Sequence, residues 1–312
     1  MSIIKIEGLT KTYRTGFWRR KKMALEKLNL VVEQGETFGY LGPNGAGKTT
    51  TLKILLGIIQ PDSGYATILD HPIDDVSLKS KIGFLPEQPY FYDYLTGKEL
   101  LEFYAHFFSL GRSERKRRIA DLLEMVSLIG AEKMALRKYS KGMLQRIGIA
   151  QALINDPEII FLDEPLSGLD PLGRKEVRDI VLRLKGEGKT IFFCSHILPD
   201  VEMICDRIGI LNKGRLIAVG NLDELLQLEA KGIEIEFSGV SEEGMKRIKK
   251  EAVRYLEQAQ RKQITLDEEN KVMSTIKLID QYGGKVLNVI PHRRSLEEIF
   301  VSSLGSEGGK AQ

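Results

Sequence analysis

The chain has 312 residues, of which 42% are hydrophobic and 29% charged, a composition typical of a globular protein with one large domain and an appendage, or with two domains. Lys and Arg total 46 against 43 Asp and Glu, so the net charge of +3 gives no global reason to expect nucleic acid as a partner. No apolar run reaches the ~20 residues that cross a bilayer, and the N-terminus lacks a signal-peptide core. We therefore expect a cytosolic chain whose two cysteines, Cys194 and Cys205, are reduced structural residues.

Strand-like apolar runs alternate with helix-like segments from residue 1 to about 220, which predicts an α/β domain with a largely parallel sheet. The expected strands cover residues 3–7, 28–32, 37–41, 65–69, 82–85, 158–162, 190–194 and 207–211. Between about residues 89 and 157 the apolar residues recur at helical spacing instead. We therefore expect a helical subdomain inserted into the α/β core.

The most informative motif is a phosphate-binding loop (P-loop) between the expected strand 37–41 and the helix that follows. Its glycines let backbone N–H groups turn toward phosphate oxygens, Lys48 supplies a cation, and the Thr49 hydroxyl can ligate Mg²⁺. The following helix directs the positive end of its dipole at the anion. The loop consists of Gly42, Pro43, Asn44, Gly45, Ala46, Gly47, Lys48, Thr49 and Thr50. The sequence therefore predicts a site for a nucleoside triphosphate.

Two carboxylates follow the apolar strand 158–162, and they point to a reaction as well as to binding. Asp163 stands at a strand end where P-loop nucleotide triphosphatases hold Mg²⁺. Glu164 comes directly after it and can reach a water lined up on the γ-phosphate, which makes it the candidate general base. The alternative for Glu164 is a surface carboxylate without a role.

The organisation changes again after residue 220. Asn221 can cap a short helix, and strands are expected at 232–237, 263–266 and 284–290, with a charged helix over 246–260 and another near 274–282. We expect residues 221–304 to form a small C-terminal α+β appendage. The tail, residues 305–312, has no apolar content and is expected to be disordered.

Over residues 1 to about 220 the chain resembles the ATP-binding cassette (ABC) family, because further family motifs follow in order. The fold that this resemblance implies is α/β, a P-loop NTPase cassette with an inserted helical subdomain. The matching residues are Tyr13 for stacking on adenine, Gln88 for sensing Mg²⁺ and the attacking water, Ser140 and Gly142 in the signature Tyr139–Arg146, Asp170 in the loop 167–170 that pairs two subunits, and His196 for contacting the γ-phosphate.

The signature departs from the commonest family pattern at two positions. Lys141 replaces a glycine and Met143 replaces a glutamine, while Ser140 and Gly142 are kept at the start of a helix expected over 141–153. Backbone donors and the dipole at that helix start still suit a phosphate. ATP hydrolysis is therefore expected, and contact between Lys141 and nucleotide stays open.

The resemblance also implies partners. In the family the signature of one subunit closes on the ATP held by another, so a homodimer or a pair with a related ATPase subunit is expected, with ATP and Mg²⁺ at the interface. Three interpretations compete: the energising subunit of a transporter with a separate transmembrane permease, a soluble mechanochemical cassette acting on DNA or ribosomes, and a P-loop NTPase outside the family. The sequence shows no coiled-coil insertion, no second cassette and no basic surface, which favours the transporter subunit over the DNA or ribosome protein. We therefore expect the chain to lie at the cytoplasmic face of the membrane and to bind no nucleic acid.

Two further segments narrow the transporter interpretation. Residues 283–287 followed by 295–300 resemble the ending of cassette subunits that serve ABC-2-type exporters, although a helix packed on a small sheet explains them as well. Residues 16–22 hold Trp18 and four consecutive cations, Arg19, Arg20, Lys21 and Lys22. They form either a solvated turn or a loop that contacts the membrane or the permease.

Overall fold

The computed structural model describes residues 1–15, 20–227, 232–258, 261–268, 270–291 and 296. The chain forms two compact units, Met1–Leu222 and Asp223–Gln312, so the division lies close to the expected boundary at residue 220. Predictions for residues 16–19, for most of the segment 295–300 and for the tail 305–312 fall outside the described residues. Among the described helices, none is both long enough and apolar enough to cross a bilayer.

The first unit is built on a six-stranded sheet with the order β10-β9-β3-β8-β7-β6. All its neighbouring strands are parallel except β9 and β10, which form an antiparallel pair at one edge. Every residue of β3, β7 and β8 is buried, as expected for central strands covered on both faces. The strands are β3 (Thr37–Leu41), β6 (Ile82–Leu85), β7 (Ile159–Asp163), β8 (Thr190–Ser195), β9 (Arg207–Asn212) and β10 (Arg215–Asn221).

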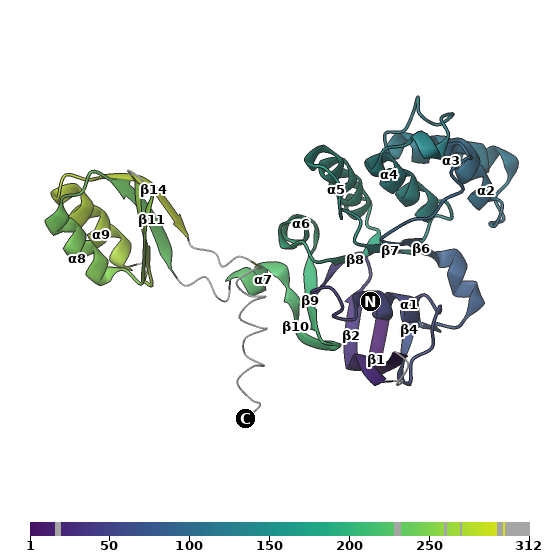
Figure 1. Cartoon of the computed structure of the whole chain (residues 1–312), viewed down its shortest axis with the longest axis horizontal. Helices are drawn as coiled ribbons and strands as arrows, with labels where there is room; N and C mark the ends of the chain where they lie inside the picture. The colour runs from purple at the N-terminus through teal and green to yellow at the C-terminus, as the bar shows by residue number, and fades with distance from the viewer. Residues whose placement is uncertain (16–19, 228–231, 259–260, 269, 292–295, 297–312) are drawn as a thin grey trace. The chain divides into compact units, whose positions relative to one another are not determined.

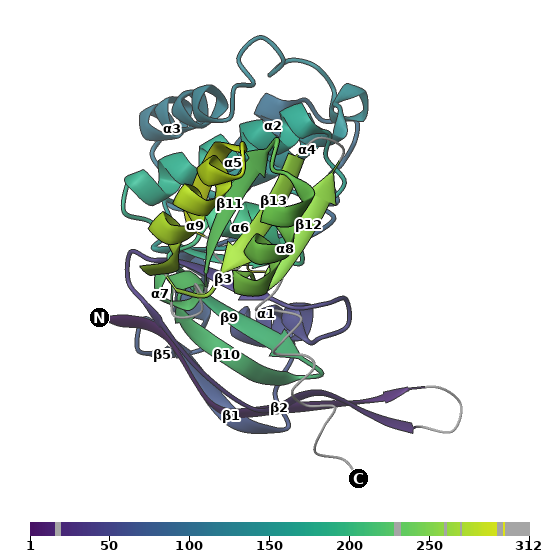
Figure 2. The same cartoon turned by 90° about the vertical axis from the view of Figure 1, so that its left-hand side faces the viewer.

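A second, antiparallel sheet has the order β2-β1-β4-β5, formed by β1 (Ser2–Thr15), β2 (Arg20–Glu33), β4 (Ser63–Ile68) and β5 (His71–Pro72). Figure 2 shows β1 and β2 running side by side along this sheet. The prediction of one largely parallel sheet is therefore wrong for the strands expected at 3–7, 28–32 and 65–69. Register shifts in the β1–β2 pair interrupt the alternation of apolar residues, which hid the length of both strands in the sequence.

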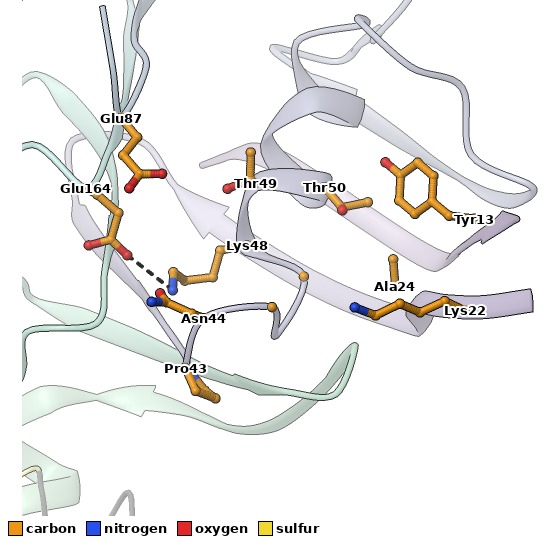
Figure 3. A pocket seen from close by; sticks show the side chains of 12 residues that line it. Tyr13, Lys22, Ala24, Pro43, Asn44, Lys48, Thr49, Thr50, Glu87 and Glu164 are labelled. Atoms are coloured by element: carbon orange, nitrogen blue, oxygen red, sulfur yellow. Dashed lines mark ion pairs between the residues drawn. The ribbon is translucent and has the colours of Figure 1, made fainter. Parts of the chain in front are cut away.

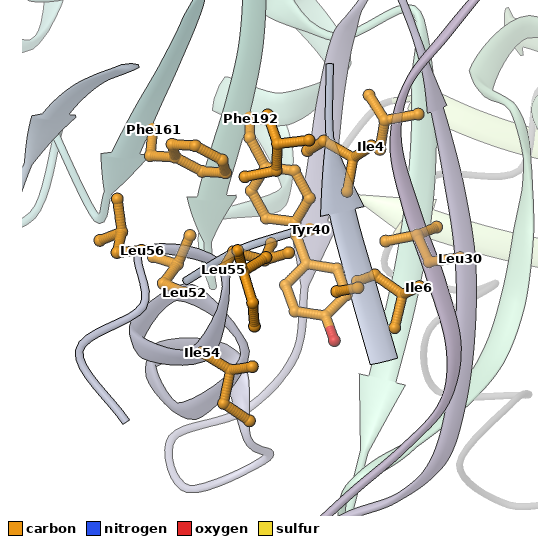
Figure 4. Packing of buried hydrophobic residues seen from close by; sticks show 14 of the residues in the cluster. Ile4, Ile6, Leu30, Tyr40, Leu52, Ile54, Leu55, Leu56, Phe161 and Phe192 are labelled. Carbon is orange, nitrogen blue, oxygen red and sulfur yellow. The ribbon is translucent and has the colours of Figure 1, made fainter. Parts of the chain in front are cut away.

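Helix α1 (Lys48–Leu55) lies between the two sheets and joins their cores (Figure 4). Leu52 and Leu55 of this helix are buried in one cluster with Tyr40 and Phe192 of the parallel sheet and with Ile4 of the antiparallel sheet. Because the P-loop immediately precedes α1, this packing holds the loop on a rigid support.

Cys194 and Cys205 are free and buried, and burial raises the pKa of both thiols.

Helices α2, α3 and α4 lie together beyond the β6 edge of the parallel sheet and form the inserted helical part (Figure 1). A capping box between Thr96 and Glu99 starts α2, and Ser140 caps α4. Helices α5 and α6 follow β7 and β8 in the chain. The helices of this unit, apart from α1, are α2 (Gly97–Ala105), α3 (Arg112–Met125), α4 (Lys141–Ala152), α5 (Pro171–Gly186) and α6 (Leu198–Ile204), with 3₁₀ turns at Val76–Lys81 and Leu136–Lys138; α7 (Leu222–Gln227) begins where the two units divide.

The second unit is a four-stranded antiparallel sheet with the order β12-β13-β11-β14 and two helices on one face (Figure 1). This βαββαβ arrangement is ferredoxin-like. Its core contains Ile235, Phe237, Ile248 and Ile264. The elements are β11 (Ile233–Ser238), α8 (Glu242–Glu251), β12 (Arg254–Gln258), β13 (Arg261–Leu266), α9 (Asn270–Gln281) and β14 (Lys285–Pro291).

The helix expected over residues 246–260 is wrong in its second half. Ala252 is extended and ends α8, and residues 254–258 pair with β13 as strand β12. The dense Lys, Arg and Glu content of this segment suggested a solvated helix, but the pairing with β13 and the packing of Tyr255 on the core override that local preference.

Candidate functional site

The P-loop connects β3 to α1 in a backbone conformation that requires glycine. Gly45 and Gly47 have φ values of 82° and 118°, which favour glycine over any residue with a side chain. A Cβ on Gly47 would also lie 2.5 Å from the carbonyl oxygen of Ala24, and one on Gly42 would meet the carbonyl oxygen of Leu211. The loop is therefore held closely against β2 and β9.

A cavity of about 540 Å³ opens over the P-loop. Tyr13 and Lys22 lie at one end of it, and Lys48, Glu164 and Glu87 lie at the other (Figure 3). It thus offers an aromatic face at one end and a phosphate-binding loop at the other, as a nucleotide requires. The predicted residues that line it are Tyr13, Pro43, Asn44, Gly45, Gly47, Lys48, Thr49, Thr50 and Glu164. Gly42 and Ala46 are buried within the same loop.

Glu164 is a buried carboxylate at the centre of a polar network that also contains the buried Lys48 and the exposed His196. Its Oε1 forms an ion pair with Lys48 Nζ at 3.2 Å, and Lys48 Nζ also donates to the Gly42 carbonyl at 2.6 Å. Its Oε2 lies 2.8 Å from His196 Nδ1 and accepts from the His196 backbone N–H at 3.3 Å. The Glu164 backbone has a φ of 50°, a strained value for a residue with a side chain. Both carboxylate oxygens are therefore held by groups from other elements.

Asp163 ends β7 and faces the P-loop helix. Its Oδ2 accepts a hydrogen bond of 3.3 Å from the Thr49 hydroxyl, while its Oδ1 is buried without a partner. Burial first, and then the negative charges of Glu164 and Glu87, raise the pKa of Asp163 to about 6. A hard divalent cation beside the carboxylate would satisfy the orphaned oxygen and offset the negative charge, so these residues fit Mg²⁺.

No group of three or more His, Cys, Asp and Glu side chains in the described part of the chain could hold a metal by itself. Mg²⁺ in nucleotide sites uses one or two protein ligands and completes its shell with phosphates and water. Gln88, the third predicted metal-facing residue, is exposed and lines a neighbouring cavity of about 430 Å³ together with Thr49 and Asp163. Glu87 lines both this second cavity and the one over the P-loop.

The residues predicted to meet nucleotide from a second subunit line neither cavity of their own chain. Ser140 accepts from the Met143 backbone N–H at the start of α4, and Asp170 accepts from the Gly173 backbone N–H at the start of α5. Gly142 approaches Gly173, so the two helix starts are adjacent. Lys141 places its ammonium group against Gly168 in the loop that precedes α5, so within this chain it contacts that loop.

Three cavity residues were missed from the sequence: Lys22, Ala24 and Glu87. Lys22 is the direct partner of Tyr13 in the antiparallel pair of β1 and β2. This register would have placed Lys22 beside the predicted adenine-stacking residue, but it can be read from the sequence only when the full length of both strands is recognised. Part of the basic run that suggested membrane contact thus lies at the cavity over the P-loop.

A parallel sheet that carries a P-loop at one strand end and an Asp-Glu pair at the end of a nearby strand defines a P-loop nucleotide triphosphatase.

Residues 25–167 match the family model described as ABC transporter. An uncharacterized ABC transporter ATP-binding protein of Synechocystis is 46% identical over 312 residues, covering 98% of this chain and 86% of the relative. The bacitracin transport ATP-binding protein BcrA of Bacillus licheniformis is 39% identical over 240 residues, covering 76% of each chain.

Among solved structures, the dimeric post-hydrolysis state of the ATP-binding cassette MJ0796 with ADP and Pi matches with a TM-score of 0.64 at 29% identity. The match covers 70% of this chain and 98% of that one. The chain belongs to the ABC transporter family: it is an ATP-binding subunit and an ATPase. Of the three interpretations, the transporter subunit is confirmed over the soluble mechanochemical cassette and the unrelated P-loop enzyme.

Lys22 provides a test of the cavity as the nucleotide site. Lys22→Met should weaken binding of AMP, ADP and ATP by about 3- to 10-fold at low salt, because it removes a cation of the cavity that attracts the negative charge of the phosphates, and it should leave the uncharged adenosine unaffected. Lys21→Met removes the same charge from the neighbouring position, which does not line the cavity, and should bind all four ligands normally. Titration calorimetry measures both variants; equal affinities for Lys22→Met and the wild type would remove Lys22 from the site.

Proposed function

We propose that this chain is the ATP-hydrolysing subunit of an ABC-2-type exporter and works through a separate permease chain at the cytoplasmic face of the membrane. The single observation that carries the proposal is the similarity to a bacitracin transport subunit over three quarters of the chain. The segment 283–287, which resembles the ending of cassette subunits that serve such exporters, adds support.

In the proposed mechanism, the P-loop amides and Lys48 bind the β- and γ-phosphates, and Tyr13 stacks on the adenine. Lys48 is paired with Glu164 before nucleotide arrives, so an incoming phosphate competes for its charge and frees a Glu164 oxygen. Glu164 then accepts a proton from the attacking water, whose oxygen bonds to the γ-phosphorus as the bond to the ADP oxygen breaks. The second Glu164 oxygen stays on His196, which fixes the orientation of the carboxylate.

Thr49, Asp163 and Gln88 are the residues proposed to hold Mg²⁺ or its water ligands. The ion supplies positive charge to the phosphate oxygens as negative charge develops on them. The unpartnered Asp163 Oδ1 is the observation that supports a cation at this place.

Two chains are proposed to complete each catalytic site. Ser140, Gly142 and Asp170 lie at adjacent helix starts outside the cavity of their own chain, and such backbone-rich starts suit the phosphates of another chain. ATP-driven closure of a homodimer, or of a pair with a related ATPase subunit, is then the mechanical output, and hydrolysis releases it.

Affinity capture from membranes tests the exporter assignment. The tagged chain, expressed in its own cells and solubilised with mild detergent, should bring down a multi-span permease identifiable by mass spectrometry. The Lys48→Ala variant should bring down the same permease, because assembly does not require bound nucleotide. Recovery of ribosomal or DNA-bound proteins in place of a permease would contradict the assignment.

A further inference from the structure

Arg174 connects two parts of the cassette that lie apart in the sequence. Its backbone N–H donates to the Asp170 carbonyl oxygen at 2.9 Å, in the first turn of α5. Its Nη2 lies 3.5 Å from Oδ2 of Asp200, which belongs to α6. Helices α5 and α6 pack on one another, and α6 begins two residues after His196 (Figure 1). Arg174 therefore contacts both the loop 167–170, which is proposed to pair two chains, and the helix that follows His196.

The carboxylate of Asp200 is buried, but its polar contacts are poor. Arg174 and Arg178, four residues apart on one face of α5, form ion pairs with it at 3.5 and 3.8 Å. A charge-assisted hydrogen bond between such groups is about 2.7–2.9 Å long, so both ion pairs are open. Asp200 Oδ2 and Arg174 Nε are buried and make no hydrogen bond among the described residues. Because buried unpaired polar atoms destabilise a fold, a small shift that closes the Arg174–Asp200 pair is favourable.

The other end of the α5–α6 contact is already closed. Lys185, in the last turn of α5, donates to the Ile204 carbonyl oxygen at 2.9 Å and pairs with Asp206 at 2.6 Å. With short contacts at this end and open ones at Asp200, the start of α5 is the end that is free to move toward α6. That end carries the loop 167–170.

We propose that Arg174 and Asp200 form a positioning pair that closes when a second subunit engages the loop 167–170. The inference rests on the proposed two-chain site and deepens it. Only one residue separates His196 from α6, and His196 contacts Glu164 Oε2 through both its ring and its backbone N–H. Closure of the pair fixes His196 against Glu164, which orients the carboxylate to accept a proton. Hydrolysis then depends on the partner chain, although neither member of the pair lines the cavity over the P-loop.

Single-turnover hydrolysis on the full chain tests the pair. Arg174→Gln should lower the rate at saturating MgATP by about 10-fold and keep the Kd for MgATP within about 2-fold, because the pair acts on turnover and not on the P-loop. Asp200→Asn should lower the rate by the same factor, and the double variant should lose no more than either single one. The Arg174 side chain is 35% exposed and Asp200 keeps Arg178 as a partner, so Arg174→Gln should stay folded.

A second background separates positioning from a merely structural role. In His196→Ala, the further change Arg174→Gln should leave the residual rate unaltered, since the pair acts through His196. Arg183→Gln is the matched control, because it removes the same charge from the same helix at an exposed ion pair with Glu187. It should hydrolyse ATP at the wild-type rate.

A fall in rate for Arg174→Gln that disappears in the His196→Ala background supports the inference. An unchanged rate for Arg174→Gln, an equal fall for Arg183→Gln, or a fall that persists without His196 overturns it. Weaker binding of MgATP in both Arg174→Gln and Asp200→Asn would assign the pair to binding and overturns it as well. Failure of the proposed two-chain site is distinguishable, because the wild-type rate per chain would then not rise with protein concentration.

Discussion

Glu164→Gln is expected to retain MgATP and to lose turnover by about 10²- to 10⁴-fold, the usual contribution of a general base. The amide keeps the size of the side chain and its contact with His196 but cannot accept a proton from water. It also removes the ion pair with Lys48, so ATP no longer competes for that ammonium group and its Kd should fall or stay equal. Single-turnover release of phosphate gives the rate, and calorimetry gives the affinity.

Glu158→Gln is the matched control for this variant. Glu158 precedes the same strand, carries the same side chain and forms only a half-exposed ion pair with Lys81, so its amide variant should hydrolyse ATP at the wild-type rate. Steady-state hydrolysis near the wild-type rate in Glu164→Gln would instead remove Glu164 from the role of base.

The parts of the site that the sequence could predict are those encoded by short, contiguous patterns. Strand β3 has the predicted bounds, Thr37–Leu41, because a buried strand followed by a glycine-rich turn is a local signal. Helix α1 spans Lys48–Leu55, so it starts and ends two residues before the helix that the sequence predicts over 50–57. Strand β7 likewise ends at Asp163, one residue beyond the predicted apolar run. The P-loop and the acidic strand end then lie at the same edge of the sheet because β3 and β7 both pair in parallel with β8.

The parts that the sequence could not predict depend on pairing between distant segments. Lys22 reaches the cavity only because it is opposite Tyr13 in a hairpin whose bulges disguise the strand period. Glu87 reaches it only because β6 pairs with β7, two strands separated by the whole inserted helical part. The contact between His196 and Glu164 similarly requires β7 and β8 to be neighbours. Local sequence motifs therefore identify the phosphate-binding loop and the acidic strand end. The pairing of distant strands decides which further side chains lie in the same site.

ATP is expected to convert the Glu164→Gln protein from a monomer into a dimer. Ser140 and Gly142 lie at the start of α4 and do not line the cavity of their own chain. We therefore expect this helix start to bind the γ-phosphate of ATP held by a second chain. Slow hydrolysis should let the closed state accumulate. Light scattering with MgATP should then approach twice the monomer mass of 35.2 kDa, and with ADP it should return to the monomer.

Two substitutions at Ser140 separate loss of the interface from loss of the fold. Ser140→Arg places bulk and a new charge at the helix start and removes its cap, whose loss alone costs about 1 kcal/mol. Ser140→Asp keeps a capping oxygen for the Met143 amide but sets a carboxylate against the phosphate, so it should stay folded and still fail to dimerise. Ser113→Arg, on an exposed position of α3, should dimerise normally.

The pattern across these three variants locates the interface. Dimers in Ser113→Arg but in neither Ser140 variant assign the contact to the start of α4, because only there does a negative charge oppose bound nucleotide while the helix stays capped. Dimers that persist in Ser140→Asp would place the phosphate elsewhere. A Glu164→Gln protein that stays monomeric with MgATP at high concentration would exclude a homodimer. The second half of the site would then have to come from a related ATPase subunit. The corresponding helix start of that subunit must carry the donors that Ser140 and Gly142 supply here.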